Sequence, residues 1–359
     1  MAQPVTRSRR SASKILVLLV ILAAIGGGLW WKFVYVPNDL SITPELPPVI
    51  PLARFEEKRP LMGTEASIVV FAPNQETATK AITTAFQRGD QIHAICSDYD
   101  PASELSKLNA SPIGTPVPLS PTLATVLAHA RETADITSGA FDPALGTLSS
   151  LWRESRESGS LPDPAALATA REASGWEHLD VDLANSTATL HAPGMKLDLG
   201  GIAKGYAADE MLLALKHHGL TRALIVIGGD VRLGDPPPDA IAWRVGLRTL
   251  SASTHESIAV ANCAVSTSGD LHQFVDINGI RYAHIIDPAT GLGLTRRTAA
   301  TIIAPTAIQS DPYATFACIN PEAALQAFIG GEIRCRIVSL DGPNFKDDRS
   351  PNFPTIGSF

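Results

Sequence analysis

The sequence predicts an α+β fold, in which helices and antiparallel hairpins are mixed along the chain. Apolar residues recur at helical spacing in several segments, and short apolar runs bounded by turn residues lie between them. The Asn278-Gly279 pair between two such runs is the strongest hairpin signal in the chain. Because strands and helices do not alternate strictly, mixed and largely antiparallel sheets with helices are favoured over a parallel sheet.

Each predicted element rests on its periodicity and on the residues at its ends. The helix at 121–137 illustrates this, since Ser120 is a good cap and Pro121 suits the first helical position. The predicted elements are a strand at 65–72, helices at 77–94, 121–137 and 164–174, a hairpin of 178–183 with 187–190, a helix at 206–218, strands at 223–227, 243–247, 257–260 and 264–267, a hairpin of 274–277 with 282–286, a strand at 301–304, helices at 310–319 and 321–328, and a strand at 334–338. The polar residues that follow are expected to form a loose tail.

The N-terminus predicts a membrane anchor. Basic residues precede an apolar run from Ile15 to Trp31, and counting through Val36 gives about the twenty residues that cross a bilayer. The basic flank predicts that the segment before the run stays in the cytoplasm. A cleaved signal peptide is the alternative, although 29–31 is a poor small-residue cleavage site. Either way, the rest of the chain is expected to be exported, and an uncleaved anchor would place it on the periplasmic side of the inner membrane.

The predicted organisation follows from these segments. A proline-rich stretch, which lacks sustained periodicity, reads as an extended linker between the membrane and the folded part. The expected boundaries are 1–13 for the cytoplasmic segment, 14–36 for the single-pass transmembrane signal anchor, 37–59 for the linker, 60–344 for the domain and 345–359 for the tail.

Composition argues against nucleic-acid binding and does not decide whether the cysteines form a disulfide. The net charge is −7 and no basic face is visible, so nucleic-acid binding is not expected. The cysteines are scattered without metal-type spacing: Cys96, Cys263, Cys318 and Cys335. A disulfide is compatible with an oxidising compartment, but small buried apolar side chains are the simpler interpretation.

The stretch 195–209 is the most informative about function. It predicts a strand, a glycine corner and a helix, with Asp198 at the end of the strand and Lys204 in the first helical turn. Gly200 and Gly201 let the backbone approach a ligand closely. The amides that open the helix, and its dipole, favour an anion. A glycine pair before a helix is often plain turn chemistry, but this corner suits a phosphate-bearing ligand.

Four other regions carry polar residues where folding alone does not need them. They are 97–106 (beginning Ser-Asp-Tyr-Asp-Pro), 138–143 (Ser-Gly-Ala-Phe-Asp-Pro), 265–270 with 284–291 (His-Ile-Ile-Asp-Pro-Ala-Thr-Gly), and 304–315 (including Ser-Asp-Pro-Tyr-Ala-Thr). With the glycine corner, their order and spacing make the sequence similar to the ApbE family, the FAD:protein FMN transferases. The resemblance covers about residues 60–340.

The resemblance implies a fold and an activity. It implies a single ApbE-like, T-fold-related catalytic domain, and Mg²⁺-dependent transfer of FMN from FAD to a threonine hydroxyl of a target protein, with release of AMP. The implied acceptor is an exported or membrane redox flavoprotein. Two alternatives remain: an FAD pyrophosphatase that releases FMN and AMP, and a non-catalytic FAD-binding protein of the same fold.

The resemblance also implies a metal site. Its expected ligands are Asp311, Thr315 and the backbone carbonyl of Gly201. Mg²⁺ prefers such hard oxygen donors, and Asp311 and Thr315 stand four residues apart on one face of a helix start. A helix-capping role for Asp311 is the structural alternative. Ala314 stands where some members seem to carry a second carboxylate, which weakens the case for a second metal ion.

For FAD, the resemblance points to residues near the flavin and adenine, beneath the ligand, at the corner and along a strand. They are Met62, Tyr99, Ala140, Phe141, Asp142, Asp198, Lys204 and Ile286. Flat aromatic faces suit the rings of the ligand, the carboxylates can accept from an amine or ribose hydroxyls, and the lysine can pair with phosphate. Simple packing is the alternative for Met62 and Phe141.

The expected base is His284. The family has a histidine in this motif, and an unperturbed imidazole titrates near neutrality. Asp287 is expected to position it or to assist near the metal. Three residues separate the two, so in a regular strand they would point to opposite faces.

Overall fold

The computed structural model describes residues 51–250, 256–271, 273–341 and 344–358. They belong to one compact unit that begins at Pro51. The predicted cytoplasmic segment, the membrane anchor and most of the linker lie outside the described residues. Within the described part of the chain, no helix is both long enough and apolar enough to cross a membrane.

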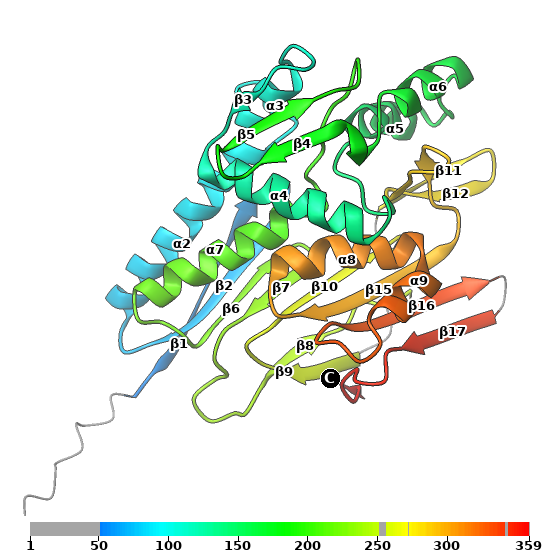
Figure 1. Ribbon diagram of the computed structural model, residues 1–359. Helices are drawn as coiled ribbons and strands as arrows, with labels where there is room; N and C mark the ends of the chain where they lie inside the picture. Colours follow the sequence, from blue (N-terminus) through cyan, green and yellow to red (C-terminus); the bar gives the residue numbers. More distant parts are fainter. Residues whose placement is uncertain (1–50, 251–255, 272, 342–343, 359) are drawn as a thin grey trace, which may run out of the picture. The chain divides into compact units, whose positions relative to one another are not determined.

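An eight-stranded sheet is the frame of this unit (Figure 1). Neighbouring strands are antiparallel throughout, which confirms the predicted α+β class. The strands in spatial order are β1 (Ala53–Leu61), β2 (Thr64–Ala72), β6 (Ala223–Ile227), β7 (Asp230–Leu233), β10 (Ala264–Gly269), β15 (Arg297–Ala304), β16 (Arg334–Asp341) and β17 (Asn344–Arg349).

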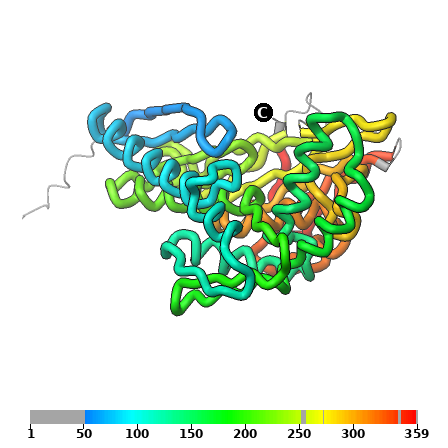
Figure 2. Tube along the Cα trace, turned by 90° about the horizontal axis from the view of Figure 1, so that it is seen from above, coloured from blue at the N-terminus to red at the C-terminus, as the bar shows by residue number. Residues whose placement is uncertain are grey.

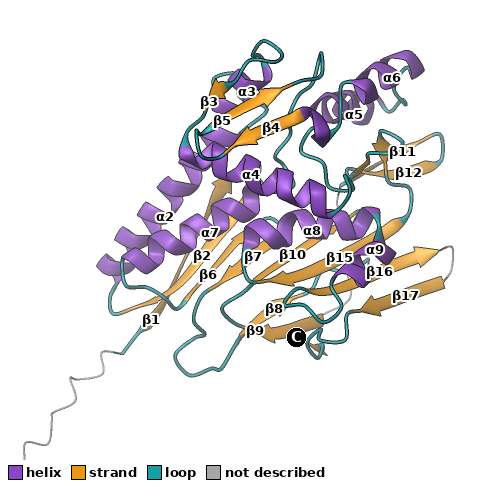
Figure 3. Ribbon diagram, in the orientation of Figure 1, coloured by secondary structure: helices purple, strands orange, loops and turns teal. Residues whose placement is uncertain are grey.

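Helices cover one face of the sheet (Figure 3). They are α2 (Gln75–Cys96), α7 (Ala203–His217), α8 (Ala307–Ile319) and α9 (Pro321–Ala327). The alternation along β2 shows how the sheet separates two cores, since Ile68 and Val70 face the helices while Val69 faces the other side. The helix-side core is the larger one and supports the glycine corner.

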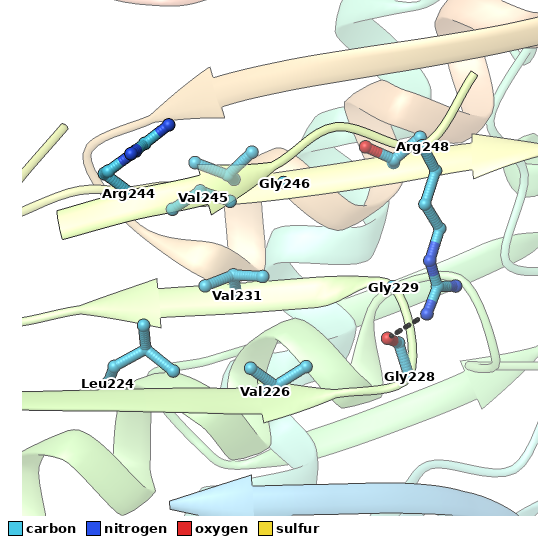
Figure 4. Close-up of a pocket in the computed structure, with 11 residues that line it drawn as sticks. Leu224, Val226, Gly228, Gly229, Val231, Arg244, Val245, Gly246 and Arg248 are labelled. Atoms are coloured by element: carbon cyan, nitrogen blue, oxygen red, sulfur yellow. Dashed lines mark hydrogen bonds between the residues drawn. The ribbon is translucent and has the colours of Figure 1, made fainter. Parts of the chain in front are cut away.

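A small sheet covers part of the opposite face. Its strands are β8 (Trp243–Gly246), β9 (Glu256–Val260) and β18 (Gly357–Ser358). A pocket of about 240 Å³ lies between the two sheets, with Val226, Val231 and Val245 among its lining residues (Figure 4). At its rim, Arg248 donates a hydrogen bond of 3.0 Å to the carbonyl of Gly228. None of the predicted site residues lines this pocket.

A second group of elements, here called the lobe, comprises residues 97–199 and 274–293 and lies beside the helix layer (Figures 1 and 2). Its elements are α3 (Glu104–Asn109), β3 (Val117–Pro118), α4 (Pro121–Ile136), α5 (Gly146–Ser158), α6 (Pro164–Glu172), the 3₁₀ helix η1 (Trp176–His178), β4 (Leu179–Asp182), β5 (Thr187–Leu190), β11 (Phe274–Ile277), β12 (Ile280–Ala283), β13 (Ile286–Asp287) and β14 (Leu292–Gly293). Figure 2 looks down on this part of the molecule.

The structure confirms the predicted cap of one helix and two predicted hairpins. At the start of α4, the Ser120 hydroxyl accepts the Leu123 amide at 3.2 Å, and proline occupies the first turn. Asn278 and Gly279 have φ angles of 52° and 77°, as a type I′ hairpin turn requires. The hairpin of β4 and β5 also forms as predicted.

The predicted ends of the domain need correction. Strand β1 begins within the expected linker and ends at Leu61, β17 runs from Asn344 into the expected tail, and β18 lies within that tail. Strand β1 buries little because it is an edge strand, which also tolerates Pro60. Strand β17 is held by ion pairs of Asp347 with Arg336 and Arg349. Neither strand therefore shows an apolar pattern that sequence reasoning can detect.

Candidate functional site

The segment that leads into the glycine corner is extended but is not a strand, contrary to the prediction. Both backbone groups of Leu197 bond to the side-chain amide of Asn109: the Leu197 amide donates to Oδ1 at 2.8 Å, and Nδ2 donates to the Leu197 carbonyl at 3.0 Å. The next amide, of Asp198, donates to the Pro143 carbonyl at 2.8 Å. The corner is thus tied to the lobe by a side chain and a loop.

The corner brings together residues from three distant segments. A Cβ placed on Gly201 would lie 3.2 Å from Cε2 of Phe141 and 3.6 Å from Oγ1 of Thr315. Asp198 is oriented by the Gly200 amide, which donates to its Oδ1 at 2.8 Å. The structure therefore places Gly201 and Thr315 side by side, as the metal-site prediction requires.

Lys204 joins two buried carboxylates just behind the corner. Its Nζ lies 3.5 Å from Oδ2 of Asp311 and 3.6 Å from Oδ2 of Asp230, and it donates to the Gly200 carbonyl at 2.6 Å. The same Asp311 oxygen accepts the Gly205 amide at 3.1 Å. One of the amides that open helix α7 is therefore already occupied by a carboxylate of the protein.

Asp311 does not cap its helix. The first amides of α8, on Ala307 and Ile308, donate instead to the carboxylate of Asp209 at 3.1 and 2.8 Å. This carboxylate is also paired with Arg232 at 2.5 Å. Asp311 therefore does not cap α8, although its Oδ2 accepts an amide in the first turn of α7.

The charges of this cluster do not cancel. Burial, and the neighbouring Asp230, raise the pKa of Asp311 to about 7, although Lys204 and the Gly205 amide oppose the shift. Burial disfavours the charged form of Lys204, but Asp311 and Asp230 raise its pKa above the usual range. With both carboxylates ionised, two negative charges face one positive charge, and a further cation would balance them.

The donor atoms present fit a hard divalent cation. The Thr315 hydroxyl lies beside Gly201, and the Asp311 carboxylate lies one helical turn earlier on the same helix as Thr315. With the Gly201 carbonyl, they would offer oxygen donors of the kind that suits Mg²⁺. In the described part of the chain, no group of three or more His, Cys, Asp or Glu side chains could hold a metal ion. The fit therefore depends on the hydroxyl and the carbonyl beside the single carboxylate.

Gly205 sets how closely α7 and α8 approach. A Cβ at this position would lie 2.1 Å from the Ala307 carbonyl oxygen and 3.0 Å from Cβ of Asp311. Only glycine fits this crossing, because backbone atoms cannot move aside. The crossing fixes the separation of Gly201 and Lys204 on one helix start from Asp311 on the other helix.

A second pair of carboxylates, Asp98 and Asp198, lies on the lobe side of the corner. Nη2 of Arg153, from α5, donates to Oδ2 of Asp98 at 2.6 Å and to Oδ2 of Asp198 at 3.2 Å. The same guanidinium lies 4.2 Å from the ring centre of Tyr99. Predicted residues Tyr99 and Asp198 are thus brought together by a residue that the sequence did not reveal.

The 140–142 segment forms another wall. Phe141 is buried in the main core, so its packing role is real, yet its ring also touches the corner. Asp142 lines a pocket of about 440 Å³ together with Trp176 and Pro288. Its Oδ1 accepts the Ala144 amide at 2.7 Å, and burial raises the pKa of Asp142 to about 6 despite this hydrogen bond. Ala140 is partly buried against the same core.

Two other predicted ligand-binding residues lie farther from this centre. Met62 forms the β1–β2 turn with Gly63, and its φ of 51° is uncommon for a residue with a side chain. Ile286 is buried in the lobe core with Trp152 and Tyr282. Both are apolar side chains, and their expected contacts with the ligand remain predictions.

His284 is positioned by its surroundings to be a neutral base. It lies in the bend between β12 and β13, where its amide and its Nδ1 lie 3.1 and 3.2 Å from the Gln273 carbonyl. A carbonyl only accepts, so we assign the ring proton to Nδ1 and the lone pair to Nε2. Burial lowers the pKa of His284 to about 4, and the charge of Lys204 contributes to the shift.

Asp287 has a structural role in this conformation. Its Oδ1 accepts the Ala289 amide at 2.9 Å, and its carbonyl accepts the Gly291 amide at 2.8 Å, which closes the β13–β14 turn. The predicted strand at 282–286 is interrupted at His284, so the two residues do not occupy one regular strand. The structure shows no hydrogen bond between them among the described residues, so the expected positioning of His284 by Asp287 is not supported by contact, and its expected role near the metal stays a prediction.

Sequence reasoning missed four residues that build the site: Asn109, Arg153, Asp209 and Asp230. Asp230 follows Gly228-Gly229 at the end of the predicted strand 223–227, and this position was its only signal. Arg153 lies on helix α5, which was not predicted, because its polar sequence resembles a loop.

Comparison with known proteins gives a consistent result. Residues 62–337 match the family model described as the ApbE family. An FAD:protein FMN transferase from Treponema pallidum is 33% identical over 276 residues, which is 71% of this chain and 75% of that protein. One of the same name from Vibrio cholerae is 28% identical, over 82% of this chain and 90% of the relative.

Solved structures agree with the sequence matches. The flavin transferase ApbE from Vibrio cholerae superposes with a TM-score of 0.76 at 27% identity, covering 84% of this chain and 99% of that structure. The ApbE protein from Thermotoga maritima gives a TM-score of 0.75 at 27% identity, covering 83% and 97%.

Proposed function

The chain belongs to the ApbE family, and from this premise we propose that it is an FAD:protein FMN transferase. One observation carries the proposal: the glycine corner places Lys204 and the buried carboxylate of Asp311 next to Gly201 and Thr315. This combination of a phosphate-compatible corner and oxygen donors suits transfer at a diphosphate, in which charge neutralisation and positioning supply most of the catalysis.

The binding roles follow from the contacts. Tyr99 offers a flat ring and Asp198 a carboxylate on the lobe side, and Asp142 lines the neighbouring pocket. Lys204 supplies a positive charge at the corner itself. We assign the rings and ribitol or ribose hydroxyls of FAD to the lobe side, and the diphosphate to the corner.

Asp311, Thr315 and the Gly201 carbonyl would hold Mg²⁺. When bound there, the ion would neutralise charge on the diphosphate and make its phosphorus more electrophilic. The excess negative charge of the Lys204, Asp230 and Asp311 cluster supports this assignment, because one lysine does not neutralise two ionised carboxylates.

His284 is the proposed general base for the acceptor hydroxyl. Its Nε2 takes the proton of an incoming threonine, whose oxygen forms a bond to the phosphorus on the riboflavin side of FAD. The bond from that phosphorus to the bridging oxygen breaks, and AMP leaves with this oxygen. The lowered pKa of His284 leaves the ring unprotonated at neutral pH, so Nε2 is able to accept a proton, and it makes the ring a weaker base than an unperturbed imidazole.

We further propose that the enzyme acts outside the cytoplasm. The basic residues and the apolar run at 14–36 support a single-pass anchor in the inner membrane, with the domain on the periplasmic side. An exported or membrane redox protein would then be the acceptor.

A direct assay tests the activity. Full-length protein in detergent micelles is incubated with FAD, Mg²⁺ and a threonine-bearing acceptor domain, and intact masses are measured. The proposal expects the acceptor to gain the mass of one FMN with equimolar AMP, and no gain for the same acceptor with its threonine replaced by alanine. Release of AMP and free FMN without acceptor modification would instead indicate a pyrophosphatase. Binding of FAD with neither product would indicate a non-catalytic protein.

A further inference from the structure

Arg153 connects two segments of the site that are far apart in the sequence. It projects from helix α5, and one nitrogen, Nη2, reaches Asp98 at 2.6 Å and Asp198 at 3.2 Å. The carboxylate side chains are only 16% and 20% exposed, and Arg153 itself is 28% exposed. A charge-assisted hydrogen bond in such a partly buried setting is stronger than an exposed one.

The two carboxylates depend on this arginine. Burial and the charge of Asp198 raise the pKa of Asp98, and the hydrogen bond from Arg153 acts in the opposite direction. Without the guanidinium, two like charges would face each other at partly buried positions. Such an arrangement separates or takes up a proton. Arg153 therefore keeps the 97–100 loop against the glycine corner.

The same guanidinium also holds an exposed aromatic ring. Its central carbon lies 4.2 Å from the ring centre of Tyr99, which is within stacking range. The tyrosine is 74% exposed, so its ring remains open to a ligand although one face is covered by the guanidinium. A surface tyrosine normally samples several rotamers, whereas this one is kept in place by a planar cation.

The loop that carries Tyr99 is braced from behind as well. Ser103 donates from its hydroxyl to the Ser97 carbonyl at 2.5 Å, and Asp100 accepts the Ala102 amide at 2.8 Å. These bonds hold the loop onto α3 but do not reach the corner. Arg153 supplies the link between the loop and Asp198.

We propose that Arg153 is a positioning residue for the flavin dinucleotide. It holds Tyr99 and Asp198 at a set separation, so that a flat ring of the ligand stacks on Tyr99 while a ligand hydroxyl donates to Asp198. The inference rests on the proposed function for the identity of the ligand. It concerns binding of FAD and not the transfer chemistry, which belongs to the corner, Asp311 and His284.

The first test measures binding of FAD to the full-length protein by calorimetry and by quenching of flavin fluorescence. Arg153→Ala is expected to raise the Kd about tenfold and to reduce the quenching. Arg153→Lys keeps the charge but loses the planar stack, so an intermediate Kd is expected. Glu154→Ala, a change of a neighbouring exposed residue on the same helix, is the matched control and should bind as the unaltered protein does.

A double-mutant cycle separates positioning from independent contacts. If Arg153 acts through Tyr99, Arg153→Ala and Tyr99→Ala together should weaken binding by less than the product of their single effects. In steady-state transfer, Arg153→Ala should raise KM for FAD with kcat nearly unchanged. An unaltered Kd in Arg153→Ala, or strictly multiplicative effects in the cycle, would overturn the inference.

Hydrogen exchange on the ligand-free protein tests the role of Arg153 without FAD, so its outcome does not depend on the proposed function. Arg153→Ala should speed exchange at 97–106 and 198–202 and leave strands β10 and β15 as protected as before. Unchanged exchange in both segments would also overturn the positioning role. If the unaltered protein bound no FAD, the proposed function would fail, while the exchange experiment would still show whether Arg153 holds the two segments together.

Discussion

Two clusters of buried charge in this protein have opposite characters. The site cluster consists of Lys204, Asp230 and Asp311. The sheet cluster lies between strands of the two sheets, where Arg336 bonds both oxygens of Asp347 at 3.0 and 2.8 Å. Its other contacts are with Glu256, which pairs with Arg336, and Arg349, which pairs with Asp347.

The difference is one of charge balance. The sheet cluster has two arginines and two carboxylates, whereas the site cluster has one lysine and two carboxylates. Although burial opposes it, hydrogen bonds from Arg349 and Arg336 hold the pKa of Asp347 well below its usual range, while the pKa of Asp311 is raised to about 7. The sheet cluster thus neutralises itself, whereas the site cluster carries the unbalanced charge on which the proposed metal site depends.

The largest expected effect tests the site cluster. Asp311→Asn removes a proposed metal ligand together with the excess charge, so transfer activity should fall by about 10³-fold while the fold is kept. Magnesium should raise the melting temperature of the unaltered protein and not that of the variant, because only a protein that binds the ion gains stability from it. Transfer by Asp311→Asn at the original rate would refute the metal assignment.

The next effect tests the sheet cluster. The Arg336 side chain is 2% exposed and pairs with both Glu256 and Asp347, so Arg336→Met removes these charge-assisted hydrogen bonds and should cost about 1.5–3 kcal/mol of unfolding free energy. Arg349→Met, at a side chain that is 40% exposed, should cost less than about 1 kcal/mol. Urea denaturation measures both, and activity per folded molecule should survive in each. Equal losses for the two variants would contradict the contrast in burial.

A smaller effect concerns the imidazole of His284 and the pH dependence of the unfolding free energy. The pKa of His284 is lowered to about 4, below its ordinary value of 6.5. As the pH falls from 6.5 towards 4, the unfolded chain binds a proton at this ring and the folded chain does not, so acidification destabilises the fold. His284→Gln should therefore lose less unfolding free energy than the unaltered protein between pH 7 and pH 5. A ring that titrates near 6.5 by NMR would overturn the assignment of a desolvated, neutral imidazole.

The smallest effect concerns the buried cysteines, which are uncharged and so serve as a comparison for the two charged clusters. All four cysteines are free and buried, and burial raises the thiol pKa of Cys96, Cys318 and Cys335 to about 12. A reductant should leave the melting temperature unchanged, and iodoacetamide at pH 8 should label the native protein only slowly. Fast labelling of the native state would show that these side chains are more accessible than their burial indicates.

Those site residues that belong to short, recognisable sequence motifs could be predicted from the sequence. Asp198 and Lys204 flank a glycine corner, and Asp311 and Thr315 share a helix face, so these could be named before the structure. Asn278-Gly279 fixed a hairpin for the same reason, since the turn needs residues that tolerate positive φ. Each of these signals spans only a few residues.

The site residues that could not be predicted from the sequence depend on contacts between residues far apart in the chain. Arg153 meets Asp98 and Asp198, which are 55 and 45 residues away, and Asp311 meets the Gly205 amide over 106 residues. No periodicity identifies which carboxylate an arginine will reach. The edge strands β1 and β17 were missed for a related reason, because ladder hydrogen bonds and ion pairs hold them with little apolar burial.

The pairing of Asn109 with Leu197 has a consequence for how the protein opens. The side-chain amide of Asn109, on the six-residue helix α3, makes the two backbone hydrogen bonds to Leu197 that a neighbouring strand would otherwise make. Local fraying of so short a helix would release that approach while the eight-stranded sheet stays intact. Two hydrogen bonds of one side chain thus hold the approach to the proposed dinucleotide site, and their loss would let that approach move without unfolding the sheet.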